Sequence, residues 1–211
     1  MKNLNKFNTI PEPTLRRLSY YVVYLQKLLD AGIETVSSTQ IANNLMFDPT
    51  QVRKDLQLTE ISGHPKIGFN IKTTLESIKS SLNWNNIENA FLVGVGNLGN
   101  AVLNFSLLKY MGVNIVAAFD NNPEKIGNIV NNVEILDIER LPELSKLMKV
   151  NIGIIAVPEH AAQETADKFV AGGIKAIWNL LPCRLKVPDE IIIEEANLMQ
   201  SLAVLTNQLA K

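Results

Sequence analysis

The first part of the chain places apolar residues at the spacing of α-helices. Between residues 15 and 29 they recur every three or four positions, which predicts a helix. The segment Pro11–Thr14 would begin it, with Thr14 as the N-cap. Arg16 and Arg17 stand in its first turn, where the helix dipole does not favour cations. Position alone favours two solvated arginines, and the functional alternative is a phosphate contact or an ion pair to another domain.

Two shorter helices are predicted next. Ser37-Ser38-Thr39-Gln40 has the form of a capping box, and Asp48-Pro49-Thr50-Gln51 places a cap and a proline at a second helix start. A turn of about three residues between them is typical of a helix-turn-helix. The second helix would bury Val52 and Leu56. It would expose Thr50, Gln51, Arg53 and Lys54.

Polar and basic side chains near the start of a second helix are typical of a recognition helix that binds in the DNA major groove. Arg53 could pair with guanine or phosphate, Gln51 with adenine and Lys54 with phosphate. A solvated helix face is the alternative interpretation. The turn-rich segment 63–68, which carries Lys66, would then be the β-hairpin wing of a winged helix, and residues 71–82 predict a further helix.

The middle of the chain runs in the order strand, glycine turn, helix, strand and acid. The apolar run Phe91 to Val93 leads into Gly94-Val95-Gly96-Asn97-Leu98-Gly99. A helical pattern continues to Gly112, and a second apolar run, Val113 to Phe119, stops at Asp120. This order predicts a dinucleotide-binding βαβ unit.

The glycines have separate roles in such a site. Gly94 allows the tight turn, Gly96 lets the backbone approach the pyrophosphate, and Gly99 lets the helix pack against the strand. Asp120 lies 21 residues beyond Gly99, near the spacing of an acid that binds the adenosine ribose hydroxyls. An acid there favours NADH and NAD+ over their 2′-phosphorylated forms. The alternative is a domain of the same shape without a ligand.

The remaining pattern completes a Rossmann sheet. The loop Glu124-Lys125-Ile126-Gly127 would lie over the adenosine end of the cofactor. Ligands of these sheets lie at the carboxyl ends of the strands, so Ala156-Val157-Pro158 and Asn179 would line the nicotinamide half. Further strands are predicted near 133–136, 151–157, 174–178 and 191–193, and helices near 141–148 and 162–169.

The polar segment 83–86 marks a domain boundary. We therefore expect an α/β chain with a winged helix-turn-helix domain (1–83), a Rossmann doubly wound parallel sheet (84–196) and a C-terminal helix (197–211). That last helix has an apolar stripe, which must be buried on its own domain or in a partner subunit.

Composition and charge narrow the class of protein. No apolar run approaches the roughly 18 residues of a membrane span, and Cys183 is the only cysteine, which favours a cytoplasmic protein without membrane or disulfide. Residues 1–83 hold 10 Lys and Arg against 7 Asp and Glu, whereas residues 84–211 hold 10 against 14. A basic domain joined to an acidic one hints at nucleic acid.

The chain offers little that a dehydrogenase would need. A general acid or base should stand beside the nicotinamide, but the predicted strand ends supply Val157, Pro158 and Leu180. His160 follows the fourth strand at a helix start and is more often an exposed residue than a catalyst there. No cluster suggests a metal. The pattern favours a domain that binds the cofactor without catalysis, and a small NAD-dependent oxidoreductase is the alternative.

Several motifs in order resemble the bacterial redox-sensing repressors of the Rex family over nearly the whole chain. The N-terminal ones are Val36-Ser37-Ser38-x-x-Ile41-Ala42 and Gln51-Val52-Arg53-Lys54-Asp55-Leu56. The cofactor ones are Gly94-x-Gly96-Asn97-Leu98-Gly99, Pro123-Glu124-Lys125-Ile126-Gly127, Val157-Pro158-x-x-Ala161-Ala162-Gln163 and Asn179-x-x-Pro182.

The resemblance implies a homodimer whose C-terminal helix is swapped onto the partner subunit. It also implies that the dimer binds inverted-repeat operators in double-stranded DNA and is released by NADH. In the family an aspartate at the start of that helix exchanges partners between a tyrosine and an arginine. Arg17 matches the arginine, but Phe105 replaces the tyrosine, and Asn197 and Leu198 begin the helix. A divergent paralogue with a lost or altered redox response is therefore the alternative.

Overall fold

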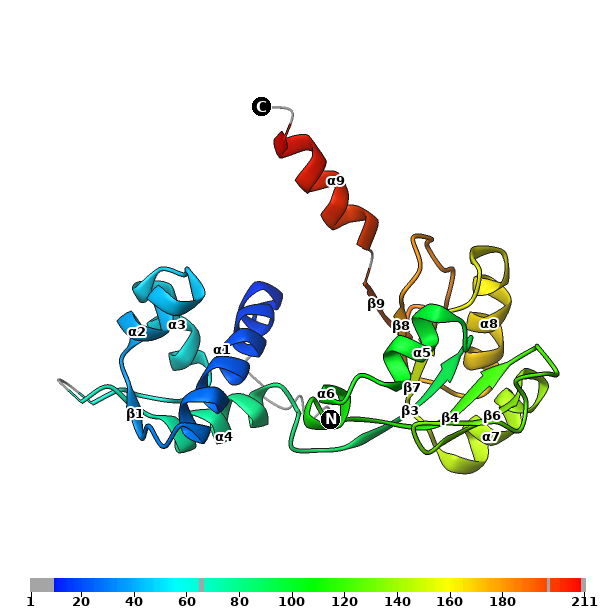
Figure 1. The fold of residues 1–211 in the computed structure, drawn as a ribbon, viewed down its shortest axis with the longest axis horizontal. Helices are drawn as coiled ribbons and strands as arrows, with labels where there is room; N and C mark the ends of the chain where they lie inside the picture. The colour runs from blue at the N-terminus through cyan, green and yellow to red at the C-terminus, as the bar shows by residue number, and fades with distance from the viewer. Residues whose placement is uncertain (1–9, 65–66, 197, 210–211) are drawn as a thin grey trace, which may run out of the picture. The chain divides into compact units, whose positions relative to one another are not determined.

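The computed structural model describes residues 10–64, 67–196 and 198–209. The chain divides into two compact units, Met1–Asn86 and Ile87–Lys211, and each is described by itself. Both predicted folds are confirmed: the first unit holds a helix-turn-helix, and the second holds a Rossmann sheet (Figure 1).

The described residues of the first unit form four helices and one pair of very short strands. Its elements are α1 (Glu12–Asp30), β1 (Thr35–Val36), α2 (Ser38–Leu45), α3 (Pro49–Leu58), β2 (Phe69–Asn70) and α4 (Ile71–Ser81). The capping box of Ser37 and Gln40 is present, and the Asp48 carboxylate accepts from the amides of Thr50 and Gln51. These local bonds begin α2 and α3, because they satisfy backbone donors that a helix start leaves free. β1 and β2 pair antiparallel beside the core.

The predicted wing is closed at its base by a β-bridge. His64 and Gly68 form an antiparallel bridge, in which each amide donates to the carbonyl of the other. Gly68 has φ +93°, and a Cβ there would lie 2.4 Å from the Val36 carbonyl oxygen. This close approach holds the base of the wing against β1, directly before α2. Lys66 lies outside the described residues.

Two predictions about α1 are wrong. The N-cap is Pro11, and Thr14 lies within the first turn of the helix with its side chain buried. Arg16 is exposed and pairs with Glu12, but Arg17 is not a solvated arginine, because it forms an ion pair with buried Asp55. Both errors have one cause: a carboxylate of α3 lies against the first turns of α1.

The second unit is a seven-stranded sheet covered on both faces. Its strands are β3 (Glu88–Val93), β4 (Val113–Asp120), β5 (Ile129–Val130), β6 (Val133–Asp137), β7 (Ile152–Ile155), β8 (Ala176–Asn179) and β9 (Ile192–Glu195). They lie in the order β5-β6-β4-β3-β7-β8-β9, all parallel except β5. Counting only the parallel strands along the chain gives the order 3-2-1-4-5-6 of a dinucleotide-binding fold.

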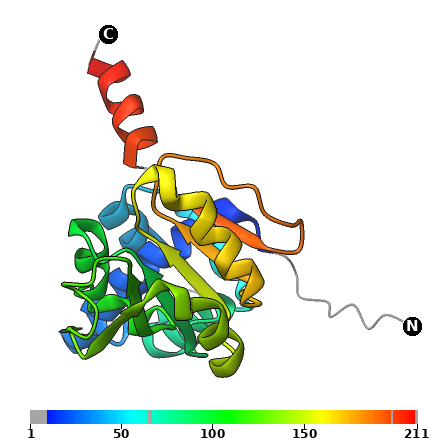
Figure 2. The ribbon, with the colours of Figure 1, turned by 90° about the vertical axis from the view of Figure 1, so that its right-hand side faces the viewer.

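Alternate residues of β3 pack on opposite faces of this sheet. Phe91 and Val93 meet α7 (Leu141–Met148), which follows the short helix η1 (Ile138–Arg140), and α8 (Glu159–Ala171). Ala90 and Leu92 meet α5 (Asn97–Leu103) on the other face. Figure 2 shows α8 along one side of the sheet.

The single helix predicted between the glycine turn and Gly112 is wrong. The structure has α5, a break at residues 104–106, and α6 (Leu107–Tyr110). At the break the Leu103 carbonyl accepts from the Asn131 side chain at 2.6 Å. That contact comes from the turn between β5 and β6, so the local sequence could not indicate it. The final helix, α9 (Leu198–Leu209), exposes Met199, Leu202, Val204, Leu205 and Leu209 in the isolated chain.

Asp55 is the one fully buried carboxylate among the described residues of the first unit. It accepts hydrogen bonds from Thr14 Oγ1 (3.1 Å), Tyr21 Oη (2.8 Å), Gln51 Nε2 (2.9 Å) and twice from Arg17 (2.7 and 2.8 Å). Burial alone would raise the pKa of Asp55, but the bonds from Arg17, Tyr21 and Gln51 hold it below its ordinary value. The Asp55 carboxylate therefore fastens α3 to α1.

Asp55→Ala should lower the free energy of unfolding of the first unit by about 3 kcal/mol, because Arg17 and Tyr21 lose their shared acceptor. Glu76→Ala, which removes an exposed carboxylate of α4 in the same unit, is the matched control and should cost less than about 0.5 kcal/mol. Urea unfolding followed by circular dichroism measures both. Equal effects of the two substitutions would contradict the structural role of Asp55.

The loss of stability in Asp55→Ala should depend on pH. Because the pKa of Asp55 is lowered in the folded state, its contribution is complete above the unfolded value of about 3.9 and is lost as pH falls through the folded pKa. The difference between wild type and Asp55→Ala should be constant from about pH 6 to pH 8 and should shrink below about pH 4.

Candidate functional site

The carboxyl ends of β3 and β7 meet where the strand order reverses. The Gly94 amide donates to the Phe119 carbonyl at the end of β4, and the Ala156 amide donates to the Val93 carbonyl at the end of β3. In open parallel sheets this switch point opens the crevice in which ligands bind. The glycine turn and the segment after β7 therefore lie together, as the sequence indicated.

The three glycines of the turn differ in what surrounds them. Gly94 has φ +94°, and a Cβ there would lie 2.6 Å from the Ala156 carbonyl oxygen. A Cβ on Gly99 would lie 1.9 Å from the Gly94 carbonyl oxygen, so this position holds α5 against the turn. A Cβ on Gly96 would meet nothing within 4 Å. Gly94 and Gly99 thus serve the fold, whereas the absent side chain of Gly96 leaves open space.

That open space adjoins the start of α5. Gly96 is the N-cap and supplies no side-chain hydrogen bond to the helix. Gly96, Asn97 and Leu98 are exposed, whereas Val95 is buried beneath them. The first amides of a helix carry partial positive charge and favour anions.

Asp120 ends β4 beside the glycine turn and is only 7% exposed. Its carboxylate accepts from the amides of Val95 (2.8 Å) and Asn122 (2.9 Å) and from Lys125 Nζ (3.0 Å). Burial alone would raise the pKa of Asp120, but these hydrogen bonds hold it below its ordinary value. Asp120 is thus an ionised acceptor that also fixes the turn, and its Oδ2 accepts from both the Val95 amide and Lys125.

The segment predicted to border the nicotinamide is less polar than the part of the site around Asp120. Ala156 is partly buried, Val157 is buried and Pro158 is exposed as the N-cap of α8. The Asn179 side chain is fully buried and shapes its own loop, because it donates to the Cys183 carbonyl and accepts from the Leu181 amide. Asn179 therefore lies at the predicted edge, but its amide is engaged within the protein.

The predicted DNA face lies on α3. Thr50, Arg53 and Lys54 are exposed, and Gln51 is partly buried with its amide on Asp55. Val52 and Leu56 face the core as predicted. The outer side of α3 therefore carries two cations and two polar side chains.

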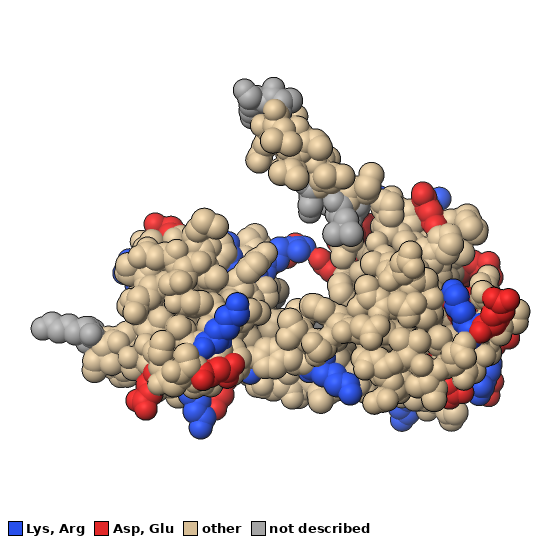
Figure 3. Space-filling model, viewed as in Figure 1, with Lys and Arg blue, Asp and Glu red and all other residues tan. Residues whose placement is uncertain are grey.

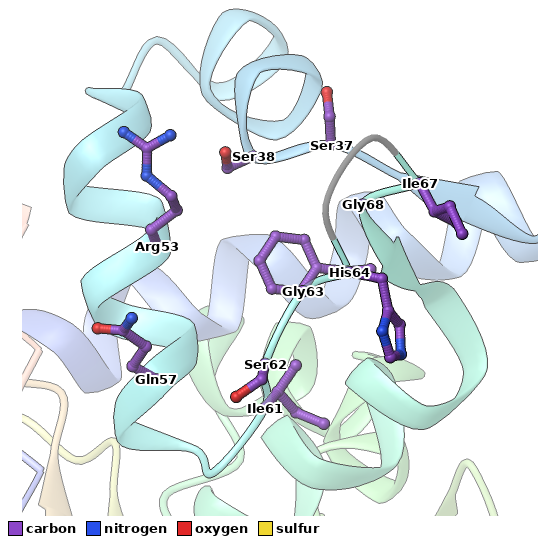
Figure 4. A pocket seen from close by; sticks show the side chains of 11 residues that line it. Ser37, Ser38, Arg53, Gln57, Ile61, Ser62, Gly63, His64, Ile67 and Gly68 are labelled. Carbon is purple, nitrogen blue, oxygen red and sulfur yellow. The ribbon is translucent and has the colours of Figure 1, made fainter.

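A cavity of about 490 Å³ lies between α3 and the wing. Figure 4 shows Arg53 and Gln57 along one wall, with Ser37 and Ser38 at the start of α2 and Gly63 and His64 across from α3. Sequence reasoning assigned neither Gln57 nor His64 to the site. The position of Gln57 four residues after Arg53, on the same helix face, could have indicated it.

The surface charge does not single out this face. In Figure 3 the charged side chains of both signs are scattered over the visible side of both units. The small excess of cations in residues 1–83 therefore does not form a large basic patch on that side. Contact with DNA would depend on individually placed cations of α3.

Some positions match the family residues that exchange partners. They lie far apart in the chain and differ in their surroundings. Arg17 is held by Asp55, which raises the pKa of Arg17 through its hydrogen bonds. Phe105 lies at the break between α5 and α6 and is 47% exposed. It borders a cavity of about 460 Å³ with Leu103, Leu108, Ile115 and Asn131 among its lining residues. Asn197 lies outside the described residues, and Leu198 is the first residue of α9.

Two features are absent from the described residues. Among residues 10–64, 67–196 and 198–209, no group of three or more His, Cys, Asp or Glu side chains is placed to hold a metal ion. Within those ranges no helix has the length and apolar character needed to span a bilayer.

Comparison with known proteins matches both units. A family model described as "Putative DNA-binding protein N-terminus" matches residues 9–57, and one described as "CoA binding domain" matches residues 85–183. A "Redox-sensing transcriptional repressor Rex" of Bacteroides fragilis is 40% identical over 200 residues, which cover 95% of this chain and 91% of the relative.

Two solved structures resemble this chain throughout. A crystal structure of RSP in complex with β-NAD+ and operator DNA has a TM-score of 0.88 at 34% identity, covering 95% of this chain and 92% of that one. A crystal structure of RSP in complex with β-NADH has a TM-score of 0.85 at 33% identity, covering 95% and 94%.

Gly96→Ala and Gly99→Ala form a matched pair that separates binding from folding. Gly96→Ala fills open space and should leave the unfolding temperature unchanged while weakening NADH binding at least tenfold, because the methyl group keeps the pyrophosphate from the backbone. In Gly99→Ala the added methyl group collides with the Gly94 carbonyl. Both the unfolding temperature and the affinity for NADH should therefore fall. Thermal unfolding and NADH fluorescence measure the two effects. Unchanged NADH affinity in Gly96→Ala would place the ligand elsewhere.

Proposed function

This chain belongs to the Rex family of redox-sensing transcriptional repressors, and we propose that it binds an inverted-repeat operator until NADH releases it. The observation that carries the proposal is the pairing, in one chain, of a helix-turn-helix with an exposed basic α3 and a Rossmann switch point with an open Gly96. One RSP structure holds NAD+ and operator DNA, and another holds NADH. They support binding of both the dinucleotide and the operator by this chain.

The residues at the switch point supply groups that a dinucleotide site needs. We assign the pyrophosphate to the turn Gly94–Gly99, where Gly96 leaves room and no N-cap side chain occupies the first amides of α5. Asp120 is ionised and would accept from the adenosine ribose hydroxyls, with Lys125 beside it. Ala156, Val157 and Pro158 would border the nicotinamide, and Asn179 would shape that border.

The chemistry of Asp120 favours NADH and NAD+ over two related ligands. NADPH carries a phosphate on the same ribose, and so does coenzyme A, the ligand named by the family model. Either phosphate would stand beside a carboxylate that already engages Lys125. A ribose with free hydroxyls instead donates to that carboxylate.

The DNA side of the proposal rests on α3 and the start of α2. Arg53 and Lys54 are exposed cations that can reach bases and phosphates, and Thr50 and Gln51 flank them. Ser37 and Ser38 begin α2 beside the same cavity, where a phosphate can meet helix amides. We also assign Lys66 of the wing to the DNA backbone, from sequence alone.

An inverted repeat calls for a two-fold partner, so we propose a homodimer. Its α9 would be swapped onto the partner subunit, because the apolar side chains of α9 are exposed in the isolated chain. NADH would favour one arrangement of the dimer over another. Only the difference in NADH affinity between these arrangements can release the operator.

A second candidate is a paralogue whose operator binding responds weakly to NADH. Two observations favour it. Phe105 has no hydroxyl to bind a switching side chain, and Arg17 is already engaged by a carboxylate of its own unit. Asn197 carries no charge and would compete poorly with Asp55 for Arg17.

The proposal is tested by fluorescence anisotropy on a family-type inverted-repeat duplex at fixed salt, since phosphate contacts make DNA affinity depend on salt. NADH should release the duplex at lower concentration than NAD+, and NADPH and coenzyme A should be at least about tenfold weaker than NADH. Binding of the duplex that none of the four ligands changes would contradict redox sensing.

Arg53→Ala should weaken operator binding by about 10- to 100-fold, because one base or phosphate contact per half-site is lost. Its affinity for NADH should stay at the wild-type value. Arg140→Ala, an exposed arginine of η1 in the second unit, is the control and should change neither. Loss of both activities in Arg53→Ala would mean that the substitution unfolds the first unit or that the DNA face is wrongly assigned.

Phe105→Tyr combined with Asn197→Asp restores the pair that the family uses. The double variant should raise the ratio of operator affinities with NAD+ and with NADH above the wild-type ratio, because the tyrosine hydroxyl can again bind the aspartate. Phe105→Tyr alone lacks that partner and serves as the control. A ratio unchanged in the double variant would show that this chain switches through other residues.

A further inference from the structure

His64 lies at the base of the wing and is exposed. Its amide donates to the Gly68 carbonyl at 2.8 Å, and its carbonyl accepts from the Gly68 amide at 2.9 Å, so hydrogen bonds hold its main chain. Among the side chains that the structure describes, none forms a hydrogen bond or ion pair with the imidazole ring. Figure 4 shows that ring projecting from the wing, away from Ser37 and Ser38.

The charged groups near the wing leave His64 without an anionic neighbour in the cavity. Of the described residues that line the cavity between α3 and the wing, the cation Arg53 is the one that carries a fixed charge. Glu60 follows α3, Glu34 precedes β1 and Lys72 lies in the first turn of α4; these exposed residues belong to the adjoining elements and do not line the cavity. Lys66 of the wing lies outside the described residues. A phosphate of DNA would supply the anion that a protonated imidazole needs.

A winged helix places its second helix in the major groove, and its wing reaches the neighbouring DNA backbone. A histidine changes its charge between about pH 5 and pH 8, whereas Lys and Arg stay charged there. We propose that His64 contacts the DNA backbone in its protonated form, so that operator binding takes up a proton and strengthens as pH falls. This inference rests on the proposed operator binding, to which it adds a contact residue and a response to pH.

The direction of the response follows from the charge of the phosphate. A phosphate within reach of an imidazole favours the protonated form, so the imidazole binds its proton more tightly in the complex than in the free protein. The added attraction is therefore present at low pH and is lost as pH rises. Each half-site of an inverted repeat would meet one His64, and a gain of about threefold per half-site gives about tenfold for the operator.

Few other groups of the chain change charge in the same range. The sequence has two histidines, and the second, His160, is an exposed residue of α8 in the other unit. Carboxyl groups ordinarily titrate at lower pH, and burial raises the pKa of Cys183 further from neutral pH. The N-terminal amino group also titrates near neutral pH, so variants of both histidines are needed to assign the response.

Fluorescence anisotropy with the inverted-repeat duplex at fixed salt measures the dissociation constant at about pH 6 and about pH 8. Wild type should bind about tenfold more tightly at the lower pH. His64→Gln keeps a polar side chain without the charge, so its affinity should be the same at both and equal that of wild type at the higher pH. His64→Lys carries a permanent cation and should bind at both as tightly as wild type does at the lower pH. His160→Gln is the matched control and should keep the wild-type response.

Two results would overturn the proposal outright: a wild-type affinity that does not change with pH, or a change that persists in His64→Gln. A third is His64→Lys binding no more tightly than His64→Gln, because the charge would then add nothing.

The salt dependence of binding separates a phosphate contact from a structural effect. Each phosphate that a cation neutralises releases counterions, so the plot of log affinity against log salt should be steeper at the lower pH by about one unit per protonated His64. His64→Gln should show one slope at both pH values. Because phosphates occur in every sequence, a scrambled duplex at low salt should show the same pH response. A response confined to the operator would mean that His64 contacts a base, and would overturn the backbone contact.

These measurements distinguish the role of His64 from the function on which it rests. If neither wild type nor His64→Lys binds the inverted-repeat duplex at either pH, operator binding itself is contradicted, and the inference with it. Binding that NADH releases but that is equal at the two pH values would contradict only the role given to His64.

Discussion

A buried carboxylate has to be satisfied by hydrogen bonds, and Asp55 obtains them from α1. This constraint decides how the first unit is built. It brings Thr14 and Arg17 of α1 to α3, and it also engages the amide of Gln51. The exposed side of α3 can then vary for DNA recognition, because the opposite side is held by charge as well as by the apolar contacts of Val52 and Leu56.

The second unit uses a carboxylate in a related way. Asp120 accepts from the Val95 amide inside the glycine turn, so one side chain both shapes the turn and presents an ionised acceptor at its edge. In both units the acid has a pKa held below its ordinary value by donors of the surrounding structure. The backbone that would meet a ligand is therefore fixed before the ligand arrives, which lowers the ordering cost of binding.

Local signals predicted most of the fold. The caps at Ser37 and Asp48 and the glycine turn before α5 act within a few residues, so the sequence alone locates these elements. What escaped prediction depends on contacts between distant residues. Arg17 meets Asp55 across 38 positions, and Asn131 meets the Leu103 carbonyl across 28, where it ends α5 early. The candidate cofactor residues were predicted from spacing, whereas the hydrogen bonds of the Gln51 and Asn179 amides within the protein required the structure.

The central claim is that one chain couples a dinucleotide site to a DNA site, and coupling between two ligands is reciprocal. The most direct measurement is the dissociation constant for NADH, from energy transfer between tryptophan and NADH, with saturating operator duplex and with a scrambled duplex. Operator DNA should weaken NADH binding by the same factor by which NADH weakens operator binding, and the scrambled duplex should change nothing. An NADH affinity that is identical with both duplexes would contradict the coupling of the two sites.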